Sequence, residues 1–373
     1  MADSNLALEK YDGQQGLSLL YDDWLALMAD VDNRCFYHDP DWFGAYFASR
    51  DVIDPTITFF AVRRGETLIA VIPLQRKPGR RPWRPTLLSM PVESQLYMPD
   101  CAIAATEDHP AIVTFVLDGI SQKYGWSWDR FTISHTLQAS LIARALGRQT
   151  ARKLMTQATD TCSIVSVRPY AELLRRMKAK YRQNLNRARR IIASLDGAEF
   201  SVVTELDEVI DTFEEFIDLE ASGWKGGTGK PRGDVLRPAA IALNEKKRRF
   251  YEAAIRAFAR RGGVEIFCVR AEGKLIGAEV WLVLGDTCFA MKTAYDENYS
   301  RMSPGVMAFD LGYQRHAAAG RTKSINTITS TPAVDDWLPD KLSVQNIDVF
   351  NSTIWGRLFA AALSIQEILR PRR

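Results

Sequence analysis

Apolar and polar positions alternate in several short runs of this 373-residue chain, and elsewhere they recur with helical spacing. One alternating pattern occurs twice. Residues 59–72 and 266–279 each predict a strand, a charged turn that contains glycine, and a second strand. The two copies begin 207 residues apart, and five of their fourteen positions are identical. This repetition predicts two similar lobes, and a chance match between two hairpins is the alternative.

The remaining patterns predict a mixture of helices and strands in both halves of the chain. In the second half they indicate a strand at 200–203, helices over 206–220 and 246–261, strands over 264–270, 275–284 and 287–295, a helix over 305–319 and a strand over 324–329. In the first half they indicate helices over 17–31, 37–47, 110–123 and 138–148, and strands over 130–133 and 161–167. A last amphipathic helix is expected over 357–369. An antiparallel meander followed by a helical crossover is typical of an α+β fold with a mixed sheet.

Residues 170–193 predict one long helix between the two halves. Its apolar stripe has spacings of three and four, at Leu174, Met177, Tyr181, Leu185, Ala188 and Ile192. The stretch 175–190 carries eight lysines and arginines, and no acid occurs between Glu172 and Asp196. We place the domain boundary just before this helix, which gives domains at 1–168 and 169–373. The basic helix is expected to meet an anionic membrane surface or an acyl carrier protein in preference to nucleic acid, and a solvated face is the alternative.

Composition adds limits to this picture. The net charge is +3, with 46% apolar and 25% charged residues, which is typical of a soluble globular protein. No apolar run approaches the length needed to span a bilayer, and the first fifteen residues lack a signal-peptide core. The five cysteines and four histidines are scattered, so we expect reduced cysteines and no metal centre. We therefore expect a cytoplasmic protein, with peripheral association at the inner face of the membrane as the alternative.

The loop Ser300–Val306 is the strongest candidate for chemistry. Pro304 and Gly305 stand where the helix 305–319 begins, so the first backbone N–H groups of that helix are expected to face outward. A helix N-terminus of this kind binds phosphate through those donors and the helix dipole, and Arg301 could pair with a phosphate oxygen. An ordinary strand-to-helix turn is the alternative.

The order of elements from 199 to 350 resembles the GNAT acyltransferases. The segments 219–228, 292–299 and 303–305 are similar to the acetyltransferase-like proteins linked to cellulose biosynthesis (CelD-type), and 40–42 and 71–74 extend the resemblance into the first half. These proteins are related to the Fem-type aminoacyl transferases, which also have two GNAT-like lobes. The resemblance implies an α+β fold of two tandem GNAT-like lobes, with mixed, mostly antiparallel sheets flanked by helices. The lobe at 1–168 is then degenerate, and the lobe at 169–373 is the acyltransferase.

The resemblance also implies acyl-CoA as the co-substrate, without a metal. In GNAT enzymes the loop before the long helix has the form Gln/Arg-x-x-Gly-x-Gly/Ala and holds the pyrophosphate of CoA. The matching residues here are Arg301, Met302, Ser303, Pro304, Gly305 and Val306. Pro304 replaces the middle glycine. Asn326 and Lys341 stand near the acidic residue and the lysine that the family tends to have further on.

Acyl transfer to an amine needs a base and donors for the oxyanion, and an acid can protonate the departing thiolate. Glu220 lies beside the glycine-dense loop 221–230, and Glu279 is a carboxylate in an otherwise apolar strand, where burial raises a carboxyl pKa. Both are candidate bases, while Tyr295 and Tyr299 are candidate acids. The expected substrate side includes Trp224, Lys225, Lys292 and Asp296. The alternatives are a solvated helix end for Glu220, a lysine partner for Glu279 and packing roles for the tyrosines.

These residues predict an N-acyltransferase in which the amine attacks the thioester directly. Proteins of this resemblance acylate sugars of exopolysaccharides, amino acids, and long-chain sphingoid bases in bacterial ceramide synthesis. We favour a lipid-like amine, as in a bacterial ceramide synthase, because of the aromatic content and the basic helix. The alternatives are a Fem-like transferase that uses aminoacyl-tRNA, an acyltransferase for an exopolysaccharide amino sugar, and a non-catalytic GNAT-like scaffold.

Overall fold

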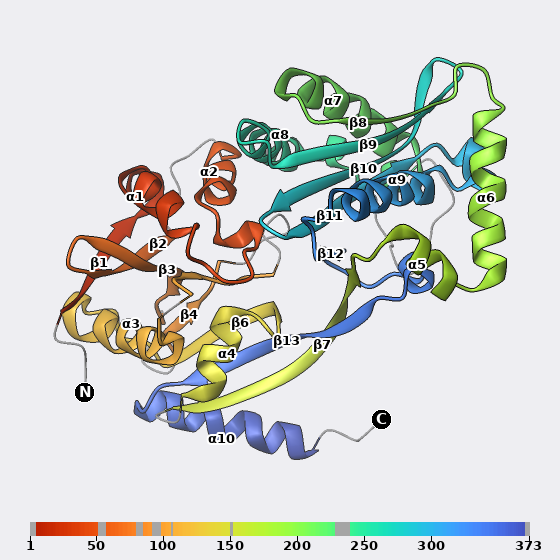
Figure 1. Cartoon of the computed structure of the whole chain (residues 1–373). Helices are drawn as coiled ribbons and strands as arrows, with labels where there is room; N and C mark the ends of the chain where they lie inside the picture. The colour runs from red at the N-terminus through yellow and green to blue at the C-terminus, as the bar shows by residue number, and fades with distance from the viewer. Residues whose placement is uncertain are drawn as a thin grey trace. The chain divides into compact units, whose positions relative to one another are not determined.

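A computed structural model describes most of the chain and divides it into two compact units (Figure 1). The described residues are 5–50, 57–79, 85–91, 98–105, 107–149, 152–227 and 239–369. Unit 1 comprises Met1–Phe43, Val52–Thr161 and Leu342–Arg373, and unit 2 comprises Gly44–Asp51 and Cys162–Lys341. The sequence placed the boundary at 168/169 and gave the whole C-terminal half to one domain. In the structure the segment from Leu342 onward belongs to unit 1.

Unit 1 is built around a mixed sheet with the strand order β1-β2-β3-β4-β6-β13. The strands are β1 (Leu6–Asp12), β2 (Thr58–Arg64), β3 (Thr67–Lys77), β4 (Leu87–Ser89), β6 (Arg130–Leu137) and β13 (Asp340–Phe350), and β5 (Ala102–Ile103) pairs with β3. All pairs are antiparallel except β4 with β6. The helices are α1 (Gly13–Leu27), α2 (Pro40–Ala48), which reaches into unit 2, α3 (His109–Tyr124), α4 (Leu141–Arg148) and α10 (Ile354–Leu369).

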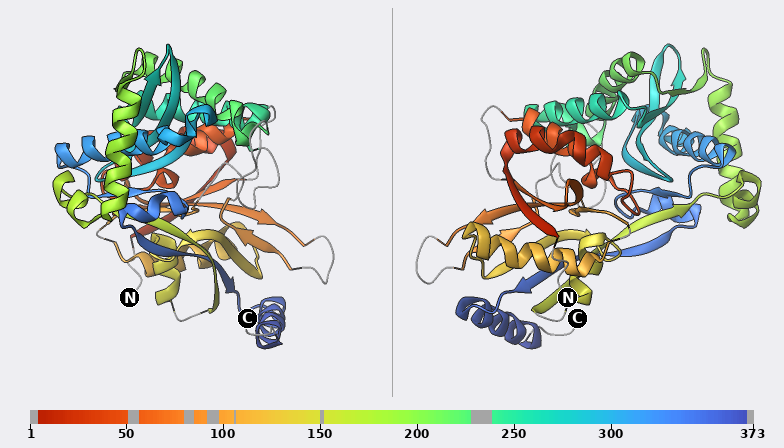
Figure 2. Two further views of the ribbon diagram at one scale, coloured as in Figure 1. Left: turned by 90° about the vertical axis from the view of Figure 1, so that its right-hand side faces the viewer. Right: turned by 60° about the vertical axis from the view of Figure 1, so that its left-hand side comes forward.

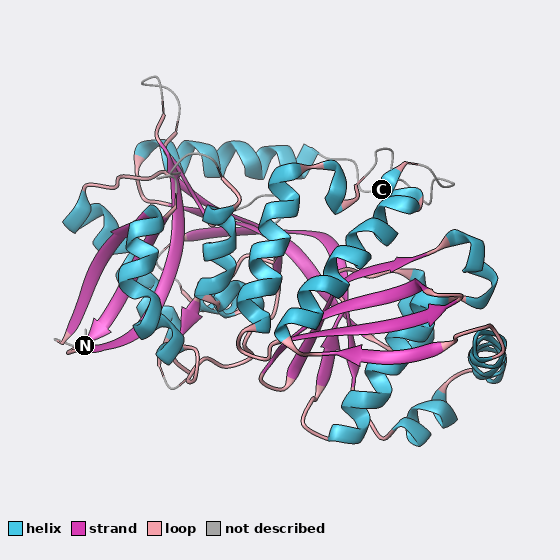
Figure 3. Cartoon of the chain, turned by 90° about the horizontal axis from the view of Figure 1, so that it is seen from above, coloured by secondary structure: helices cyan, strands magenta, loops and turns pink. Residues whose placement is uncertain are grey.

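Unit 2 holds a second run of strands, in the order β7-β12-β11-β10-β9-β8. These are β7 (Lys153–Ser166), which enters from unit 1, β12 (Ser324–Asn326), β11 (Thr287–Tyr295), β10 (Lys274–Leu284), β9 (Val264–Ala271) and β8 (Glu199–Val203). Its helices are α5 (Tyr170–Arg176), α6 (Ala179–Ala193), α7 (Leu206–Ser222), α8 (Glu245–Ala259) and α9 (Pro304–Ala319). Helix α9 covers one face of this sheet, and α7 and α8 lie on the other (Figures 1 and 3).

The repeated pattern of the sequence corresponds to two β-hairpins, as predicted. Strands β2 and β3 pair antiparallel in unit 1, and strands β9 and β10 do so in unit 2. Each turn contains a glycine with positive φ, Gly65 at 58° and Gly273 at 75°. Only glycine adopts this backbone conformation at little cost, so the glycines mark the turns in the sequence.

The single helix predicted over 170–193 is wrong, because the chain breaks it into α5 and α6. Met177 and Lys178 have extended backbone, with ψ of 152° and 135°. The Arg182 guanidinium donates to the carbonyl oxygens of Leu174 and Met177, at 2.8 Å each, and so occupies acceptors at the C-terminal end of α5. The Arg182 side chain therefore supplies the hydrogen bonds that backbone N–H groups would have supplied to these carbonyl oxygens in a continuous helix.

Four strands were not predicted, and two of them, β4 and β5, are only three and two residues long. Strand β1 lies in the polar N-terminal stretch, and β13 runs through a segment to which no element had been assigned. In β1 the apolar residues Leu6–Leu8 are consecutive, and in β13 the alternation changes phase between Val344 and Ile347, where the ladder has a register shift, so neither strand gives a continuous alternating signal. Among the helices of the described part of the chain, none combines the length and apolar character that crossing a bilayer requires.

Candidate functional site

Helix α9 begins at Pro304, within one residue of the start that the sequence predicted. Ser303 adopts the left-handed conformation, with φ 48° and ψ 54°, and its side chain does not cap the helix. Pro304 is the first helical residue and has no N–H. Since Met307 donates to the Ser303 carbonyl at 3.1 Å, the first N–H groups without an intrahelical acceptor are those of Gly305 and Val306. These two donors sit at the positive end of the helix dipole.

Glycines allow this helix end to lie directly on the sheet. A Cβ added to Gly277 of β10 would come within 2.7 Å of the Pro304 carbonyl carbon. A Cβ added to Gly305 would lie 3.2 Å from the Thr293 hydroxyl oxygen and 3.5 Å from the Tyr295 ring, both on β11. A side chain at 277 would therefore push α9 away from the sheet. The close approach places the first turn of α9 beside the middle of β10 and the end of β11.

The sheet opens next to this helix end. Strand β12 pairs with β11 only from Thr287 to Phe289, and over residues 290–295 the described ladders pair β11 with β10 alone. The chain turns away after β12, where the Asn326 side-chain oxygen accepts from the Ile328 N–H at 2.7 Å. Asn326, which stands near the family's acidic position, thus holds a turn. The outer edge of β11 presents backbone acceptors, and the Lys225 amine donates to one of them, the Thr293 carbonyl, at 2.6 Å.

Glu279 is a buried carboxylate beside this opening. Its exposed fraction is 7%, its Oε2 accepts from the Trp281 indole N–H at 3.1 Å, and Thr293 lies opposite it across the β10–β11 ladder. Burial raises its pKa to about 7, against hydrogen bonds from Trp281 and Thr293 and the charge of Lys225, which all lower it. A carboxyl group that titrates near neutrality is suited to take up and release a proton. The strand pattern had indicated such an environment.

Glu220 and Lys225 form a second, linked pair at the end of α7. Glu220 is 3% exposed, so the reading of a solvated helix end is wrong. Its Oε1 lies 3.1 Å from the Lys225 amine, and its Oε2 accepts from the Ile241 N–H at 2.8 Å. Both carboxylate oxygens are therefore engaged. Burial lowers the pKa of Lys225, while the charge of Glu220 opposes that shift.

More positive charge surrounds this pair. Burial, together with the charges of Lys292 and Lys225, lowers the pKa of Lys247 on α8 to about 8. The Lys292 amine lies 4.8 Å from the centre of the Tyr251 ring, within range of a cation–π contact. Lys247 was not among the predicted site residues. The sequence around Lys247 predicts only the polar start of a helix, and nothing in it indicates a site residue. Folding alone brings Lys247 near Glu220.

The other predicted residues divide between this site and its surroundings. Tyr295 contacts the α9 helix end, and the Trp224 ring lies 5.8 Å from the Lys225 amine. Asp296 instead accepts from the Asn298 N–H at 2.9 Å and caps the 3₁₀ helix η4 (Glu297–Met302). The Tyr299 hydroxyl donates to Glu272 in the β9–β10 turn, which raises the pKa of Tyr299. The structure thus brings Tyr295 to the helix end and binds Tyr299 elsewhere.

The remaining predicted positions lie around the same loop. Arg301 and Ser303 are exposed, Met302 and Val306 are half-buried, and Pro304 and Gly305 are buried. Lys341 pairs with Asp335 at 2.9 Å on the surface. The glycine-dense loop 221–230 is described as far as Gly227, and Thr228–Lys230 lie outside the described residues. Gly277 and Thr293 were missed, although a glycine inside an apolar strand is itself a signal of close backbone approach.

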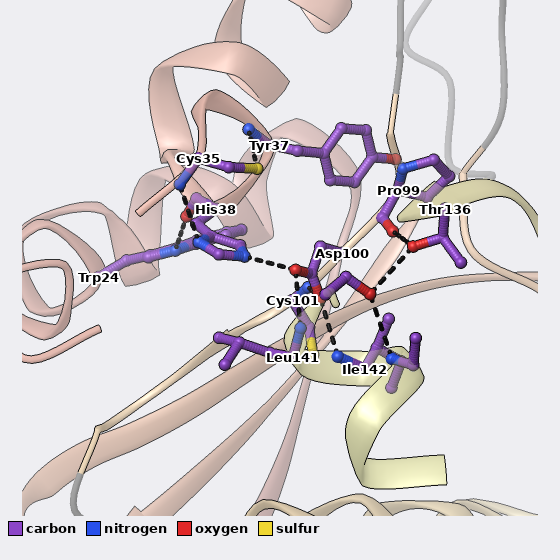
Figure 4. A network of polar contacts seen from close by, with 12 residues as sticks. Trp24, Cys35, Tyr37, His38, Pro99, Asp100, Cys101, Thr136, Leu141 and Ile142 are labelled. Carbon is purple, nitrogen blue, oxygen red and sulfur yellow. Dashed lines mark hydrogen bonds and ion pairs between the residues drawn. The ribbon is translucent and has the colours of Figure 1, made fainter. Parts of the chain in front are cut away.

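Unit 1 contains a different polar cluster, centred on Asp100 (Figure 4). The His38 Nδ1 accepts from the Cys35 N–H at 3.2 Å, so Nε2 carries the proton and donates to Asp100 at 3.0 Å. The same carboxylate accepts backbone N–H groups of Cys101 and of Leu141 and Ile142 at the start of α4, at 2.9 to 3.1 Å. His38 is 1% and Asp100 5% exposed. The cluster is fully bonded and buried, which indicates a structural role.

Comparisons with known proteins agree with this architecture. Residues 179–325, from the start of α6 to β12, match the family model described as the acetyltransferase (GNAT) domain. The crystal structure of FemX superimposes on this chain with a TM-score of 0.58 at 10% sequence identity. The superposition covers 91% of this chain and 96% of the FemX chain. A conserved protein of unknown function from Bacteroides thetaiotaomicron gives a TM-score of 0.52 at 12% identity, over 89% and 97% of the two chains. No match was found among curated protein sequences.

Residues 179–325 are therefore similar to the GNAT domain family, and this stretch includes Glu220, Lys225, Glu279 and the first turn of α9. The predicted fold class, α+β with a mixed, mostly antiparallel sheet flanked by helices, is confirmed, and the match over residues 179–325 agrees with a GNAT-like second lobe. The identities to the solved structures are low, so those likenesses concern the fold.

Proposed function

We propose that this protein is an N-acyltransferase that moves an acyl group from a thioester, expected to be acyl-CoA, to a primary amine. One observation carries the proposal: the buried Glu279, with a pKa of about 7, lies beside a helix end whose Gly305 and Val306 N–H groups have no intrahelical acceptor. A base and a phosphate-binding helix end are the two parts that this reaction needs in one place. The match to the GNAT domain family supports the same reaction class.

In this proposal the thioester binds at the first turn of α9. Its phosphate groups accept from the Gly305 and Val306 N–H groups, and the exposed Arg301 supplies a positive charge nearby. Pro304 stands where the family has a glycine, but a proline at the first helical position removes only an N–H that α9 does not need. The contact between Gly277 and Pro304 keeps the helix end in place.

The reaction follows from the groups that surround this position. The amine nitrogen attacks the thioester carbonyl carbon, a C–N bond forms, and Glu279 accepts the ammonium proton. The tetrahedral intermediate then loses the thiolate as its C–S bond breaks, and the thiolate takes a proton from Tyr295 or from water. The products are an amide and a thiol. Burial raises the pKa values of Cys268 and Cys288 to about 12, so these thiols are poor nucleophiles and direct attack is favoured.

For the acceptor we propose a lipid-like primary amine, such as a long-chain sphingoid base. The half-buried Trp224 ring lies close to the Lys225 amine, so an apolar chain and a polar head could be held by neighbouring groups. This substrate class rests on the resemblance and on composition, and the experiment below decides among acceptors.

The test is to incubate the purified protein with palmitoyl-CoA and, separately, sphinganine, glucosamine and a set of amino acids, and to look for amides by mass spectrometry. We expect an amide with wild type, and strongly reduced formation with Glu279→Gln. Conservative replacement of the exposed Glu215, which pairs with Arg270 on the surface, serves as the control. Absence of any amide with every acceptor would count against the proposal.

A second candidate is aminoacyl transfer from a charged tRNA. The fold likeness to FemX and the basic helix α6 favour it over a scaffold. A gel shift with aminoacyl-tRNA, together with transfer of a labelled amino acid to a peptide or lipid amine, separates the two candidates. Transfer from tRNA without amide formation from an acyl thioester would select this second function.

A further inference from the structure

Helices α5 and α6 present a basic surface to solvent. Three of their cations, Arg175, Lys180 and Arg187, are exposed and pair with no acid in the described part of the chain. Their neighbours are better satisfied, since Arg189 binds Asp310 and Lys178 lies 3.4 Å from Asp336. We define the α5–α6 surface by Arg175, Lys180, Arg182, Asn186 and Arg187.

The opposite side of these helices is part of the core. Leu173, Met177, Leu185, Ala188 and Ile192 are buried in the cluster that also contains residues of α9. The large apolar residues that the described chain exposes lie elsewhere, at Leu19, Leu243, Leu338, Ile354, Leu358 and Ile365. The α5–α6 surface therefore offers charge but no apolar side that could enter a bilayer, which membrane-binding amphipathic helices require.

The position of the surface links it to the proposed thioester site. Helix α6 contacts η4 and α9, and stands upright beside them in both views of Figure 2. The 3₁₀ helix η4 carries Arg301 and leads directly into Ser303, the residue before α9. A partner that docks on α6 would thus be adjacent to the loop that receives the thioester.

A hollow lies in the elbow between α5 and α6. Its volume is about 450 Å³, and it is lined by Leu174, Arg175, Arg182 and Asn186. Arg182 is held in place by its bonds to the Leu174 and Met177 carbonyls. The hollow thus places the Leu174 side chain next to two cations, Arg182, which is held in place, and Arg175, which is exposed. This combination suits a protein partner that presents an apolar side chain surrounded by acidic residues.

We propose that the α5–α6 surface docks an acidic thioester carrier protein, which delivers the acyl group to the α9 helix end. This inference rests on the proposed acyl transfer and names the form of its donor. A helix of 15 residues extends over about 22 Å, so its charges match an extended acidic protein surface better than a single nucleotide. Single-stranded nucleic acid is less suited, because stacking needs exposed aromatic rings and the Tyr181 ring packs against Trp337 at 6.3 Å.

The test compares two donors, palmitoyl-CoA and a palmitoylated acyl carrier protein, in wild type and in a charge-reversal variant with Arg175→Glu, Lys180→Glu and Arg187→Glu. We expect kcat/KM with the carrier donor to fall by about tenfold or more at low salt, since interfacial charges set the rate of encounter. We expect kcat/KM with palmitoyl-CoA to change by less than about twofold, because this donor does not dock on the α5–α6 surface. The matched control reverses three exposed arginines elsewhere, Arg144, Arg148 and Arg256, and should leave both donors unaffected.

Calorimetric binding of the carrier protein tests the docking without the chemistry. Binding by wild type that disappears in the charge-reversal variant, with an unchanged thermal melt, supports the proposal. If neither thioester yields an amide but the carrier protein still binds, the proposed function is wrong and the docking proposal is retained. No carrier binding, or binding only to anionic vesicles or to tRNA, would overturn the docking proposal. An equal loss with both donors would assign the surface to the nucleotide of CoA instead, and would overturn it as well.

Discussion

Gly277 of β10 and Pro304 of α9 are in direct backbone contact, so that a Cβ on the glycine would lie 2.7 Å from the proline carbonyl carbon. A second glycine acts in the same way further along α9, since a Cβ at Gly312 would come within 2.7 Å of the Trp281 ring. Helix α9 thus packs closely against the sheet at two glycines, Gly277 of β10 and Gly312 of α9. Its N-terminus is held beside Glu279 by the first of these contacts.

Replacement of Gly277 by alanine should displace the start of α9. We expect Gly277→Ala to lower the free energy of unfolding by about 1–3 kcal/mol, as overpacking does, and to weaken thioester binding more than amine binding. Urea unfolding and KM for each substrate measure these effects. Gly147→Ala in α4 is the control, because nothing lies within 4 Å of the added Cβ. Equal effects of the two variants would contradict the role given to Gly277.

The pH dependence of the rate should follow Glu279. Its raised pKa means that the carboxylate, the form that acts as a base, is gained only as the pH rises through about 7. We expect kcat/KM of wild type to fall about tenfold per pH unit below that value. Glu279→Gln should lose about 10²- to 10⁴-fold in rate and lose this acidic limb. An unchanged pH profile in the variant would show that another group is the base.

The Glu220–Lys225 pair should contribute to stability because it is buried. The Glu220 side chain is 1% and that of Lys225 20% exposed, and Lys225→Met leaves the carboxylate without its cation. We expect a loss on the order of 3 kcal/mol in the free energy of unfolding, measured by urea denaturation. Lys323→Met breaks an exposed pair with Asp286 and should have little effect. Similar losses in both variants would contradict this account of the buried pair.

In unit 1, Asp100 should determine the stability of the start of α4. Asp100→Ala removes the acceptor for the Leu141 and Ile142 N–H groups and for His38, and we expect a cost of about 3 kcal/mol. Ser140→Ala removes one cap, the bond from the Ala143 N–H, and should cost about 1 kcal/mol. Hydrogen exchange of the α4 amides measures both. Slower exchange in Asp100→Ala than in Ser140→Ala would refute the structural role.

The sequence allowed some of these features to be predicted because their causes are local. The hairpins could be read from Gly65 and Gly273, and the burial of Glu279 from its apolar strand. Features that depend on distant residues could not. Strand β13 pairs with β6, where Asp348 meets Arg130 across 218 positions. The break at Met177 depends on a side chain that reaches back to carbonyl oxygens, which helical periodicity does not record.

The candidate site shows the same division. The start of α9 was indicated by Pro304 and Gly305, which are adjacent in sequence. The bond between the Lys225 amine and the Thr293 carbonyl joins residues 68 positions apart, and it exists only because β11 loses its partner strand there. Lys247 enters the site by the packing of α7 with α8.

Hydrogen exchange at Gly305 and Val306 tests the central claim most directly. These amides have no intrahelical acceptor, so they should exchange quickly in the protein alone. We predict marked protection of both amides when a saturating acyl thioester is added, either palmitoyl-CoA or the palmitoylated carrier protein, and no protection at the α4 amides of unit 1. Unchanged exchange at Gly305 and Val306 with both donors would contradict the assignment of the α9 helix end as the thioester site.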